Sequence, residues 1–312
     1  QLGRFLQYHK GAPYINELVL YFFPDFESAV NAVREHTVDG VSFVPERMRA
    51  RIPATGVSVF KASIPRFTGI FFQDRRAPVL REKAVRQALS RALDREAITT
   101  LTPDAEAAIA PFIENQVGYA RTLIAPAYNL EDAARLLEGA GWKKDGEIWK
   151  KDQQPLSVRL TVLDEPIQLT VADAVRSAWK KLGVEVTLEA VRREAFEQGV
   201  LRTRAYEILL FSFVEGRDGD PYSFWHSTQI DHPGLNLSSL RVRGIDIALE
   251  QARIETDPAA RLDRYLEFQK LFHEEAPGVI LYTSPYIYVV SKKVRGIEVQ
   301  TVALPSDRFF GI

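Results

Sequence analysis

The chain has 312 residues, a hydrophobic fraction of 46% and nearly balanced charge, with 40 Lys and Arg residues against 41 Asp and Glu residues. This length can form two lobes. The balanced charge argues against a broad nucleic-acid surface, which needs a basic face, so we predict no nucleic-acid partner. The lack of cysteine excludes disulfides, thiolate nucleophiles and thiolate metal sites.

No apolar run in the sequence approaches the length of a membrane span. The sequence holds no signal peptide either, so a secreted protein would have to appear here in mature or truncated form.

The first third of the chain alternates strand and helix patterns. Apolar, β-prone runs predict strands at 18–23, 38–44, 57–60 and 67–72. Apolar residues at helical spacing predict helices at 26–36 and 78–100, of which the second has the stronger pattern.

The middle of the chain carries the clearest topology signal. Alternating apolar residues predict strands at 156–162 and 184–188, with a helix between them that stops at Gly183. A second helix at 192–204 leads to a third strand at 206–214. Strands joined by helical crossovers should be parallel, so this region predicts an open α/β sheet.

A loop rich in charge, glycine and aromatic residues, EGRDGDPYSFW, follows the third strand at 215–225. In open α/β folds, ligands bind just beyond the carboxyl ends of such strands. The loop is therefore the first candidate for a binding site. Farther on, β-prone runs at 279–283 and 286–290 are separated by Pro285, where the chain should bend or change sheets.

Seven segments, taken in chain order, resemble the family 5 extracellular solute-binding proteins, the peptide, dipeptide and nickel receptors of bacterial ABC importers. The segments are YHKGAPYI at 8–15, EHTVDGVSFV at 35–44, FTGIFFQ at 67–73, AVRQALSRALDREAI at 84–98, YNLEDAARLLEGAGW at 128–142, GDPYSFW at 219–225 and EEAPGVILYTSPYIYVVSKKVRGI at 274–297. The resemblance runs through essentially the whole chain, and the order of the segments is more specific than any one of them.

This resemblance implies a type II periplasmic-binding-protein fold, an α/β fold whose two lobes contain mixed sheets flanked by helices. It also implies a chain without the amino-terminal portion of the family, so that the first lobe is incomplete. Residues 1–72 would be the returning part of lobe I, residues 73–284 the second large lobe, and residues 285–312 the crossing back. The exposed sheet edge would then need the missing amino-terminal portion or self-association as a partner.

In peptide-binding members of the family, an aromatic residue ends the strand before the loop, and an aspartate after it pairs with the ligand's amino group. The aromatic position matches Phe213, and the aspartate column falls on Gly216, Arg217 or Asp218. Asp218 would favour an amine on the ligand, whereas Arg217 would favour a carboxylate or phosphate.

Three more residues complete the candidate ligand-binding set, each with a competing structural reading. Glu215 is a candidate for a cationic ligand group, while Trp225 and Tyr282 either line the site or pack beneath it. We predict no metal site and no cofactor, because the five histidines are dispersed through the sequence.

The resulting hypothesis is a non-enzymatic receptor that captures a peptide or another small solute between two lobes and delivers it to ABC permease subunits. Its location would be periplasmic or extracellular, either free or anchored as a lipoprotein. One alternative is the ligand-sensing domain of a transcriptional regulator fused to a DNA-binding module. The other is a hydrolase that uses the loop carboxylates of Asp218, Asp220 or Glu215.

Overall fold

The computed structural model describes residues 1–312 except 10, 115, 121, 124, 217, 299–300 and 310–312. The described residues fall into two compact units: unit 1 comprises Gln1–Ile64 and Pro285–Ile312, and unit 2 comprises Pro65–Ser284. The predicted boundary after residue 72 differs from this division, because residues 66–72 form a strand inside the sheet of unit 2. The later change of unit falls at Pro285.

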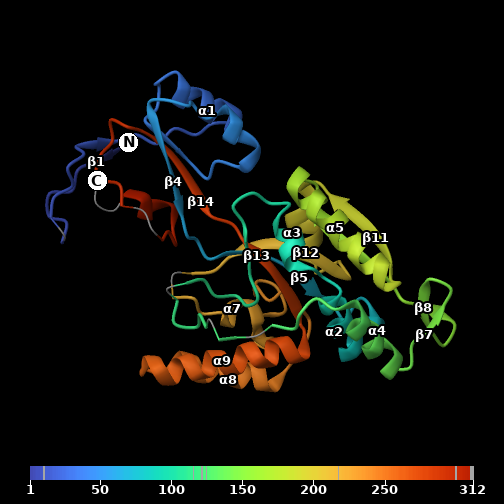
Figure 1. Cartoon of the computed structure of the whole chain (residues 1–312). Helices are drawn as coiled ribbons and strands as arrows, with labels where there is room; N and C mark the ends of the chain where they lie inside the picture. Colours follow the sequence, from blue (N-terminus) through green and yellow to red (C-terminus); the bar gives the residue numbers. More distant parts are fainter. Residues whose placement is uncertain are drawn as a thin grey trace. The chain divides into compact units, whose positions relative to one another are not determined.

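Unit 1 is built around a small sheet with the strand order β3-β14-β4 (Figure 1). Apolar side chains cover both faces of β14: Ile287 and Val289 pack with Val30 and Val33 of α1, whereas Tyr286 and Tyr288 pack in a second cluster. The elements of unit 1 are β1 (Leu2–Gly3), β2 (Glu17–Leu18), α1 (Phe26–Arg34), β3 (Gly40–Ser42), η1 (Glu46–Arg51), β4 (Val57–Ala62), β14 (Tyr286–Ser291) and η5 (Pro305–Phe309).

A groove of about 650 Å³ in unit 1 lies between residues 19–23 and the edge strand β3. Of the strand predicted over 18–23, only Leu18 is in a strand, as the last residue of β2. Residues 19–23 of the described structure are not in a strand. Phe22 is 95% exposed. A β-prone apolar run beside an unpaired strand edge can accept another strand. The prediction that another part of a longer protein, or a second copy, covers this edge stays a prediction.

Unit 2 contains a large sheet with the strand order β11-β10-β12-β5-β13-β6. β10 runs parallel to β11 and to β12, whereas β12, β5, β13 and β6 pair in antiparallel fashion. This topology confirms the parallel crossovers predicted from the sequence and the mixed α/β class.

The elements of unit 2 are β5 (Arg66–Phe72), η2 (Pro78–Arg81), α2 (Lys83–Arg91), α3 (Arg95–Thr99), β6 (Glu106–Ala107), α4 (Leu130–Gly139), β7 (Lys143–Asp145), β8 (Ile148–Lys151), β9 (Gln154–Pro155), β10 (Ser157–Leu163), α5 (Pro166–Leu182), β11 (Glu185–Val191), α6 (Arg193–Ala195), η3 (Phe196–Leu201), β12 (Ile208–Val214), α7 (Tyr222–Trp225), η4 (Ser227–Gln229), α8 (Arg243–Ile254), α9 (Pro258–Glu275) and β13 (Gly278–Thr283).

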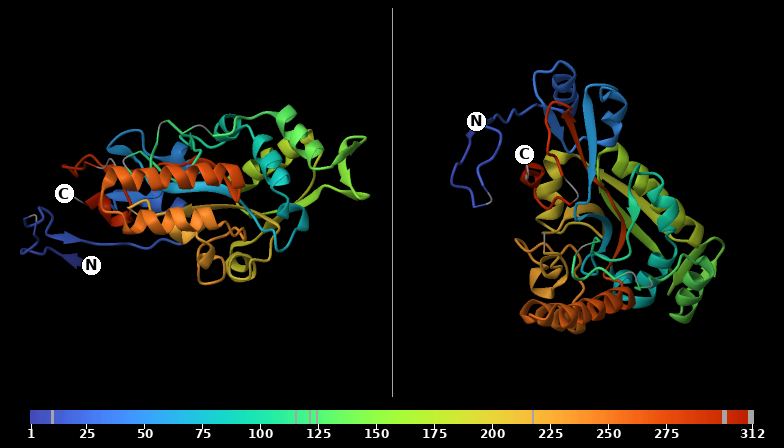
Figure 2. Two further views of the ribbon diagram at one scale, coloured as in Figure 1. Left: turned by 90° about the horizontal axis from the view of Figure 1, so that it is seen from below. Right: turned by 60° about the vertical axis from the view of Figure 1, so that its left-hand side comes forward.

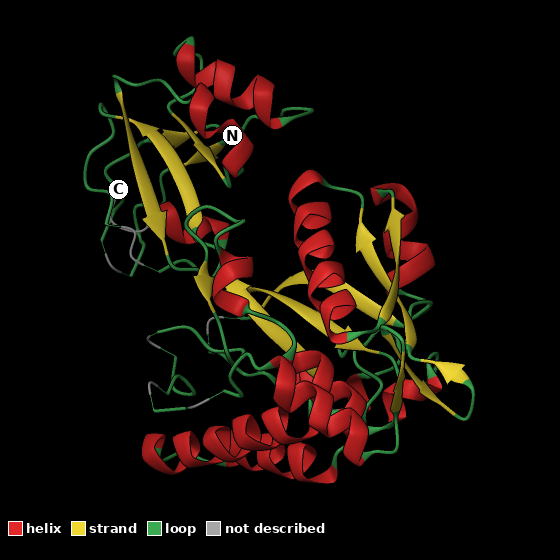
Figure 3. Ribbon diagram, turned by 45° about the vertical axis from the view of Figure 1, so that its right-hand side comes forward, coloured by secondary structure: helices red, strands yellow, loops and turns green. Residues whose placement is uncertain are grey.

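Helices cover both faces of the large sheet (Figure 3). On one face, called face A, Ile208 and Leu210 of β12 pack with α2, α4 and α5. On the opposite face B, Leu209 and Phe213 pack with α8 and α9, which run side by side (Figure 2). Since successive strand residues point to opposite faces, β12 is apolar on both sides over most of its length.

The predicted helix over 78–100 is divided into η2, α2 and α3. Asp94 explains the second break, because its side chain accepts a hydrogen bond from the amide of Ala97 and so begins a new helix. α5 keeps its predicted end, since Gly183 adopts the left-handed conformation with φ of 100°. The Trp179 indole of α5 donates to the carbonyl of Leu89 at 2.9 Å and fixes α5 against α2.

Candidate functional site

The candidate site lies at the edge of the large sheet where its parallel strands end. β10 ends at Leu163 and β12 at Val214, while the antiparallel β5 begins at Arg66 beside the end of β12. In open α/β sheets, this is the edge where ligands are usually bound. Unit 2 therefore offers a position for a ligand within its own structure.

A row of hydroxyl side chains crosses face A at this edge. Thr68 of β5 pairs in register with Ser212 of β12 on one side and with Tyr282 of β13 on the other. The Thr68 Oγ1 and Ser212 Oγ atoms lie 2.7 Å apart and share a hydrogen bond. We call Tyr282, Thr68 and Ser212 the hydroxyl row.

Helix α5 contributes an amide to the hydroxyl row from its first turn. The Gln168 Nε2 atom donates to Ser212 Oγ at 3.0 Å. The Gln168 Oε1 atom is buried and has no hydrogen-bond partner among the described residues. Pro166 starts the helix close to the end of β10, so the short connection places this amide beside the strand ends. A buried acceptor without a donor is a position that a ligand N–H or water can fill.

Tyr282 reaches face A because of an irregularity in β13. The register between β13 and β5 shifts between Ile280 and Tyr282. Ile280 packs on face B, whereas Leu281 and Tyr282 both belong to the cluster on face A. An extra residue in one strand changes the direction of the side chains that follow it. The bulge therefore brings Tyr282 into the hydroxyl row.

Arg66 lies two residues before Thr68 and therefore on the same face of β5. Its side chain is partly buried, and it forms no hydrogen bond or ion pair with any residue that the structure describes. Burial lowers the pKa of the guanidinium, and the Tyr282 hydroxyl acts in the opposite direction. The strand register places Arg66 opposite Val214, beside Thr68 at the end of the hydroxyl row. We call Arg66, Gln168 and the hydroxyl row the edge site.

Two of the predicted site residues, Phe213 and Trp225, lie in the core on face B. Phe213 is 5% exposed, and its ring is 5.6 Å from the rings of Phe67 and Phe71. Trp225 stacks on Phe71 at 5.4 Å. Phe213 and Trp225 thus gather around Phe71, on the side of the sheet opposite Tyr282. The sequence left two roles open for Trp225, lining the site or packing beneath it, and in this structure its ring packs in the core.

Glu215 is buried directly after β12. Its amide donates to the carbonyl of Pro65 at 2.8 Å, but both carboxylate oxygens lack a hydrogen-bond partner among the described residues. Burial raises the pKa of Glu215 well above its ordinary value, and the charge of Asp220 raises it further. The side chain is 2% exposed, so it can meet a cationic ligand group only after a change in the surrounding loop.

The other loop carboxylates are paired with arginines of the helices on face B. Asp218 binds Arg261 of α9 at 2.6 Å, and Asp220 binds Arg253 of α8 at 2.6 Å. Asp220 also accepts from the amide of Tyr222 at 3.1 Å, which fits the structural role of an Asp-Pro turn. Arg217, the alternative to Asp218, lies outside the described residues.

Replacing Asp218 by Asn should change the free energy of unfolding by less than about 1 kcal/mol, because the pair with Arg261 is solvent-exposed on the side of Asp218. Chemical denaturation of the variant and of Arg261→Gln tests this value. A loss of several kcal/mol in either variant would contradict the assignment of the pair to the surface.

Within the described residues, no three His, Asp or Glu side chains are arranged to hold a metal ion. The ring of His226, the histidine that follows the loop directly, makes contacts with neighbouring side chains. Its Nδ1 atom lies 2.8 Å from Thr228 Oγ1, and its Nε2 atom lies 3.2 Å from Glu250 Oε1. The ring also stacks on Tyr222 with centroids 4.1 Å apart.

Sequence reasoning missed four residues of the edge site: Arg66, Thr68, Gln168 and Ser212. A usable signal exists for the strand residues, because Arg66 and Thr68 introduce polar groups into the apolar run RFTGIFF, as does Ser212 in ILLFSFV. Polar side chains in strands that are otherwise buried need partners, and two adjacent strands supply them here.

A family model described as bacterial extracellular solute-binding proteins, family 5 middle part, matches residues 1–232. The chain belongs to this family. The match covers β5, β10, β12 and α5, which carry most of the edge site.

Among curated proteins, the chain is 25% identical to the oligopeptide-binding protein AppA of Bacillus subtilis over 283 residues, which are 88% of this chain and 52% of AppA. It is also 25% identical to the oligopeptide-binding protein OppA of Mycobacterium tuberculosis, covering 86% of this chain and 46% of OppA. The chain thus spans about half the length of these relatives.

Solved structures show the same fold at lower sequence identity. AppA of Bacillus subtilis in complex with a nonapeptide has a TM-score of 0.77 and 22% identity, over 93% of this chain and 59% of that one. NikZ of Campylobacter jejuni in complex with Ni(L-His) has a TM-score of 0.78 and 21% identity, over 89% and 57% of the two chains.

Proposed function

We propose that this chain is the substrate-binding component of an ABC importer, or a large part of one, and that it binds a peptide or another small solute without changing it chemically. The observation that carries this proposal is the family match over residues 1–232. The named relatives support it, since AppA and OppA are oligopeptide-binding proteins. Permease subunits in the membrane would be the partners that receive the solute.

The contacts of the loop carboxylates favour binding over hydrolysis. A hydrolytic pair needs two acids that face the same reacting bond. Asp218 and Asp220 instead bind different arginines, and Glu215 is buried in the protein. The edge site supplies hydroxyl, amide and guanidinium groups, which orient a solute by hydrogen bonds.

The proposed location is periplasmic or extracellular, in agreement with the family, and a lipid anchor stays an alternative to a free protein. Within the described residues, no helix combines the length and apolar character needed to cross a bilayer.

A ligand panel tests the proposed function on the full-length protein. Thermal unfolding is measured with peptides of increasing length, free amino acids and nickel–histidine mixtures. A solute at 100 times its dissociation constant should stabilise the native state by about 2.7 kcal/mol, because it binds the folded protein and not the unfolded chain. Mass spectrometry then checks that each bound solute is released unchanged.

Two results would contradict the proposal. One is the absence of stabilisation by every solute in the panel, together with no small molecule retained through native purification. The other is conversion of a bound solute into a product, which would restore the enzyme alternative.

A further inference from the structure

We propose that Arg66 is an anion-binding residue of the ligand site and that the solute carries a carboxylate, or a similar planar oxyanion, which binds this guanidinium. The proposal rests on the function proposed above and adds a chemical class to the solute. Arg66 lies outside the loop to which sequence reasoning assigned the ligand contacts.

The first argument is the lack of a partner for a charge that is partly removed from water. Arg66 forms no ion pair or side-chain hydrogen bond with the described residues. The other largely buried arginines of unit 2 differ, since Arg86 donates to four carbonyls and Arg95 donates to the carbonyls of Ile280 and Pro126. An unpaired buried charge is costly, so such a group usually has a counterion.

The second argument is the position of Arg66 beside further donors. It is the first residue of β5, opposite Val214, and it points to the same face as Thr68. Thr68 and Ser212 hold adjacent hydroxyls, and Tyr282 lies in the same row. Hydroxyl groups beside a guanidinium can donate to the oxygens of a carboxylate that the guanidinium binds.

The third argument concerns the charge of the surroundings. Burial lowers the pKa of Arg66, and among the described residues the Tyr282 hydroxyl, not a carboxylate, raises it. The loop acids Asp218 and Asp220 bind Arg261 and Arg253 on face B of the sheet. Within the described residues the guanidinium therefore keeps its positive charge available on face A. A planar, bidentate fork of donors matches a carboxylate better than it matches a neutral carbonyl.

An anion titration tests the site before the solute is known. The melting temperature of the full-length protein is measured in sodium acetate and in sodium chloride at equal ionic strength, with acetate as the carboxylate probe. We expect acetate to stabilise the wild type more than chloride does, and we expect Arg66→Gln to lose this difference. Arg76→Gln, which removes an exposed arginine of the same unit, should keep it.

The stability of the variant without added carboxylate separates binding from a structural role. If Arg66 serves to bind an anion and does not stabilise the fold, Arg66→Gln should unfold at the same temperature as the wild type or higher, because an unpaired charge is removed. A clear fall in melting temperature, or acetate stabilisation that is absent in the wild type or unchanged in Arg66→Gln, overturns the proposal.

Matched peptides then distinguish the source of the carboxylate. Trialanine carries it at the chain end, Ala-Glu-Ala amide in a side chain, and trialanine amide lacks it. A probe that binds through Arg66 should bind about 10- to 100-fold more weakly to Arg66→Gln, as for loss of a hydrogen bond to a charged group. Arg66→Lys should restore this binding in part, because it keeps the charge but loses the fork.

The failures of the two proposals give different results. Solutes that bind equally well with and without a carboxylate, and equally well to Arg66→Gln, would refute the role of Arg66 and leave the proposed function in place. A panel in which no solute binds would refute the proposed function, while the acetate titration would still decide whether Arg66 binds anions.

Discussion

Replacing Arg86 by Met should lower the free energy of unfolding of unit 2 by about 3–5 kcal/mol, because several buried carbonyls lose a charged donor and each buried group left unsatisfied costs about 1–3 kcal/mol. Arg86 is 2% exposed and donates to the carbonyls of Leu80 and Arg81 at 2.8 and 3.1 Å. It also donates to the carbonyls of Glu275 and Ala276, at 2.8 and 3.2 Å.

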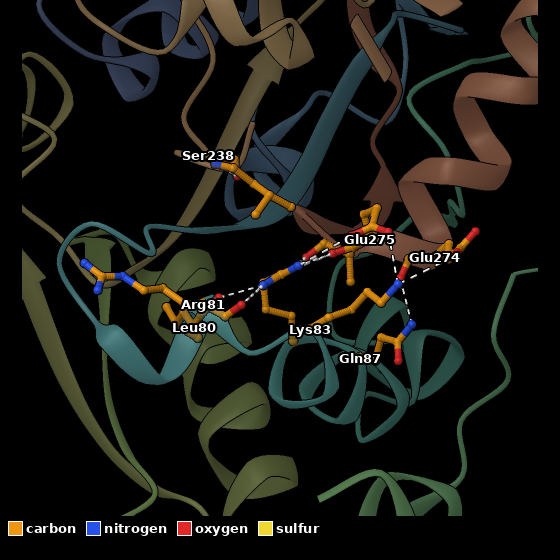
Figure 4. A network of polar contacts seen from close by, with 10 residues as sticks. Leu80, Arg81, Lys83, Gln87, Ser238, Glu274 and Glu275 are labelled. Carbon is orange, nitrogen blue, oxygen red and sulfur yellow. Dashed lines mark hydrogen bonds and ion pairs between the residues drawn. The ribbon is translucent and has the colours of Figure 1, made fainter. Parts of the chain in front are cut away.

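This side chain joins α2 to η2, which precedes it directly in the sequence, and to the end of α9, which is 189 residues farther along the chain. It lies on α2 and donates to carbonyls at the end of η2 and at the end of α9. Figure 4 labels the partner residues Leu80, Arg81 and Glu275. Lys83 and Gln87 of α2 add contacts from the same helix, to the carboxylate of Glu275 at 3.1 Å and to the carbonyl of Glu274 at 2.7 Å. Methionine fills much of the volume of Arg86 but leaves four carbonyls without their donor.

Tryptophan fluorescence during urea unfolding measures this effect in unit 2, since Trp142, Trp149, Trp179 and Trp225 all belong to that unit. Arg81→Ala is the matched control, because this exposed side chain contacts no hydrogen-bond or ion-pair partner among the described residues while its carbonyl is retained. It should change the free energy of unfolding by less than about 0.5 kcal/mol. Equal losses in both variants would show that Arg86 does not hold the three segments together.

Replacing Glu215 by Gln should stabilise unit 2 at neutral and alkaline pH and leave it unchanged at acid pH. Burial, followed by the charge of Asp220, raises the pKa of Glu215 well above 4.5 in the folded protein. The folded state therefore binds the proton more tightly than the unfolded chain. As pH rises from about 4.5 toward the raised pKa, the wild type loses stability, by at most about 1.4 kcal/mol per pH unit for one proton.

The difference in unfolding free energy between Glu215→Gln and the wild type, measured from pH 4 to pH 9, isolates this contribution. His273 acts in the opposite direction, because burial lowers its pKa to about 4 and stability is lost as pH falls from 6.5. This contribution is common to both proteins and cancels in the difference. Glu194→Gln, at an exposed position, is the control. A difference that does not change with pH would mean that the Glu215 carboxylate has a partner when charged.

The parallel part of the large sheet could be predicted because its signals are local. Alternation in β10 and β11, a helical pattern between them and Gly183 at the end of α5 specify a β-α-β unit within about 35 residues, in line with the usual size of such units. The antiparallel insertion of β5 between β12 and β13 could not be predicted in this way. It joins residues 66–72 to strands more than a hundred residues farther along the chain.

The sequence and the structure point to the same edge of the sheet for the candidate site, but only Tyr282 of the predicted residues belongs to the edge site on face A. Phe213 and Trp225 pack on face B. Phe213 and Ser212 are neighbours in the sequence, and pleating sends Phe213 to face B and Ser212 to face A. The pairing of Asp218 with Arg261 depends on how α9 packs, which no pattern near the loop reveals. The role proposed for Arg66 rests on its partial burial and on the lack of a partner among the described residues, and neither property can be predicted from the sequence of one strand.

The bulge in β13 has a consequence for comparing this protein with its relatives. A single inserted residue carries Tyr282 from one face of the sheet to the other without any substitution in the site itself. Two homologues can therefore have the same tyrosine in an alignment column but place its side chain on opposite faces of the sheet. Ligand-site residues of family members are therefore better compared by their pairing positions in the sheet than by alignment columns. An insertion or deletion in a strand can change the site as effectively as a substitution.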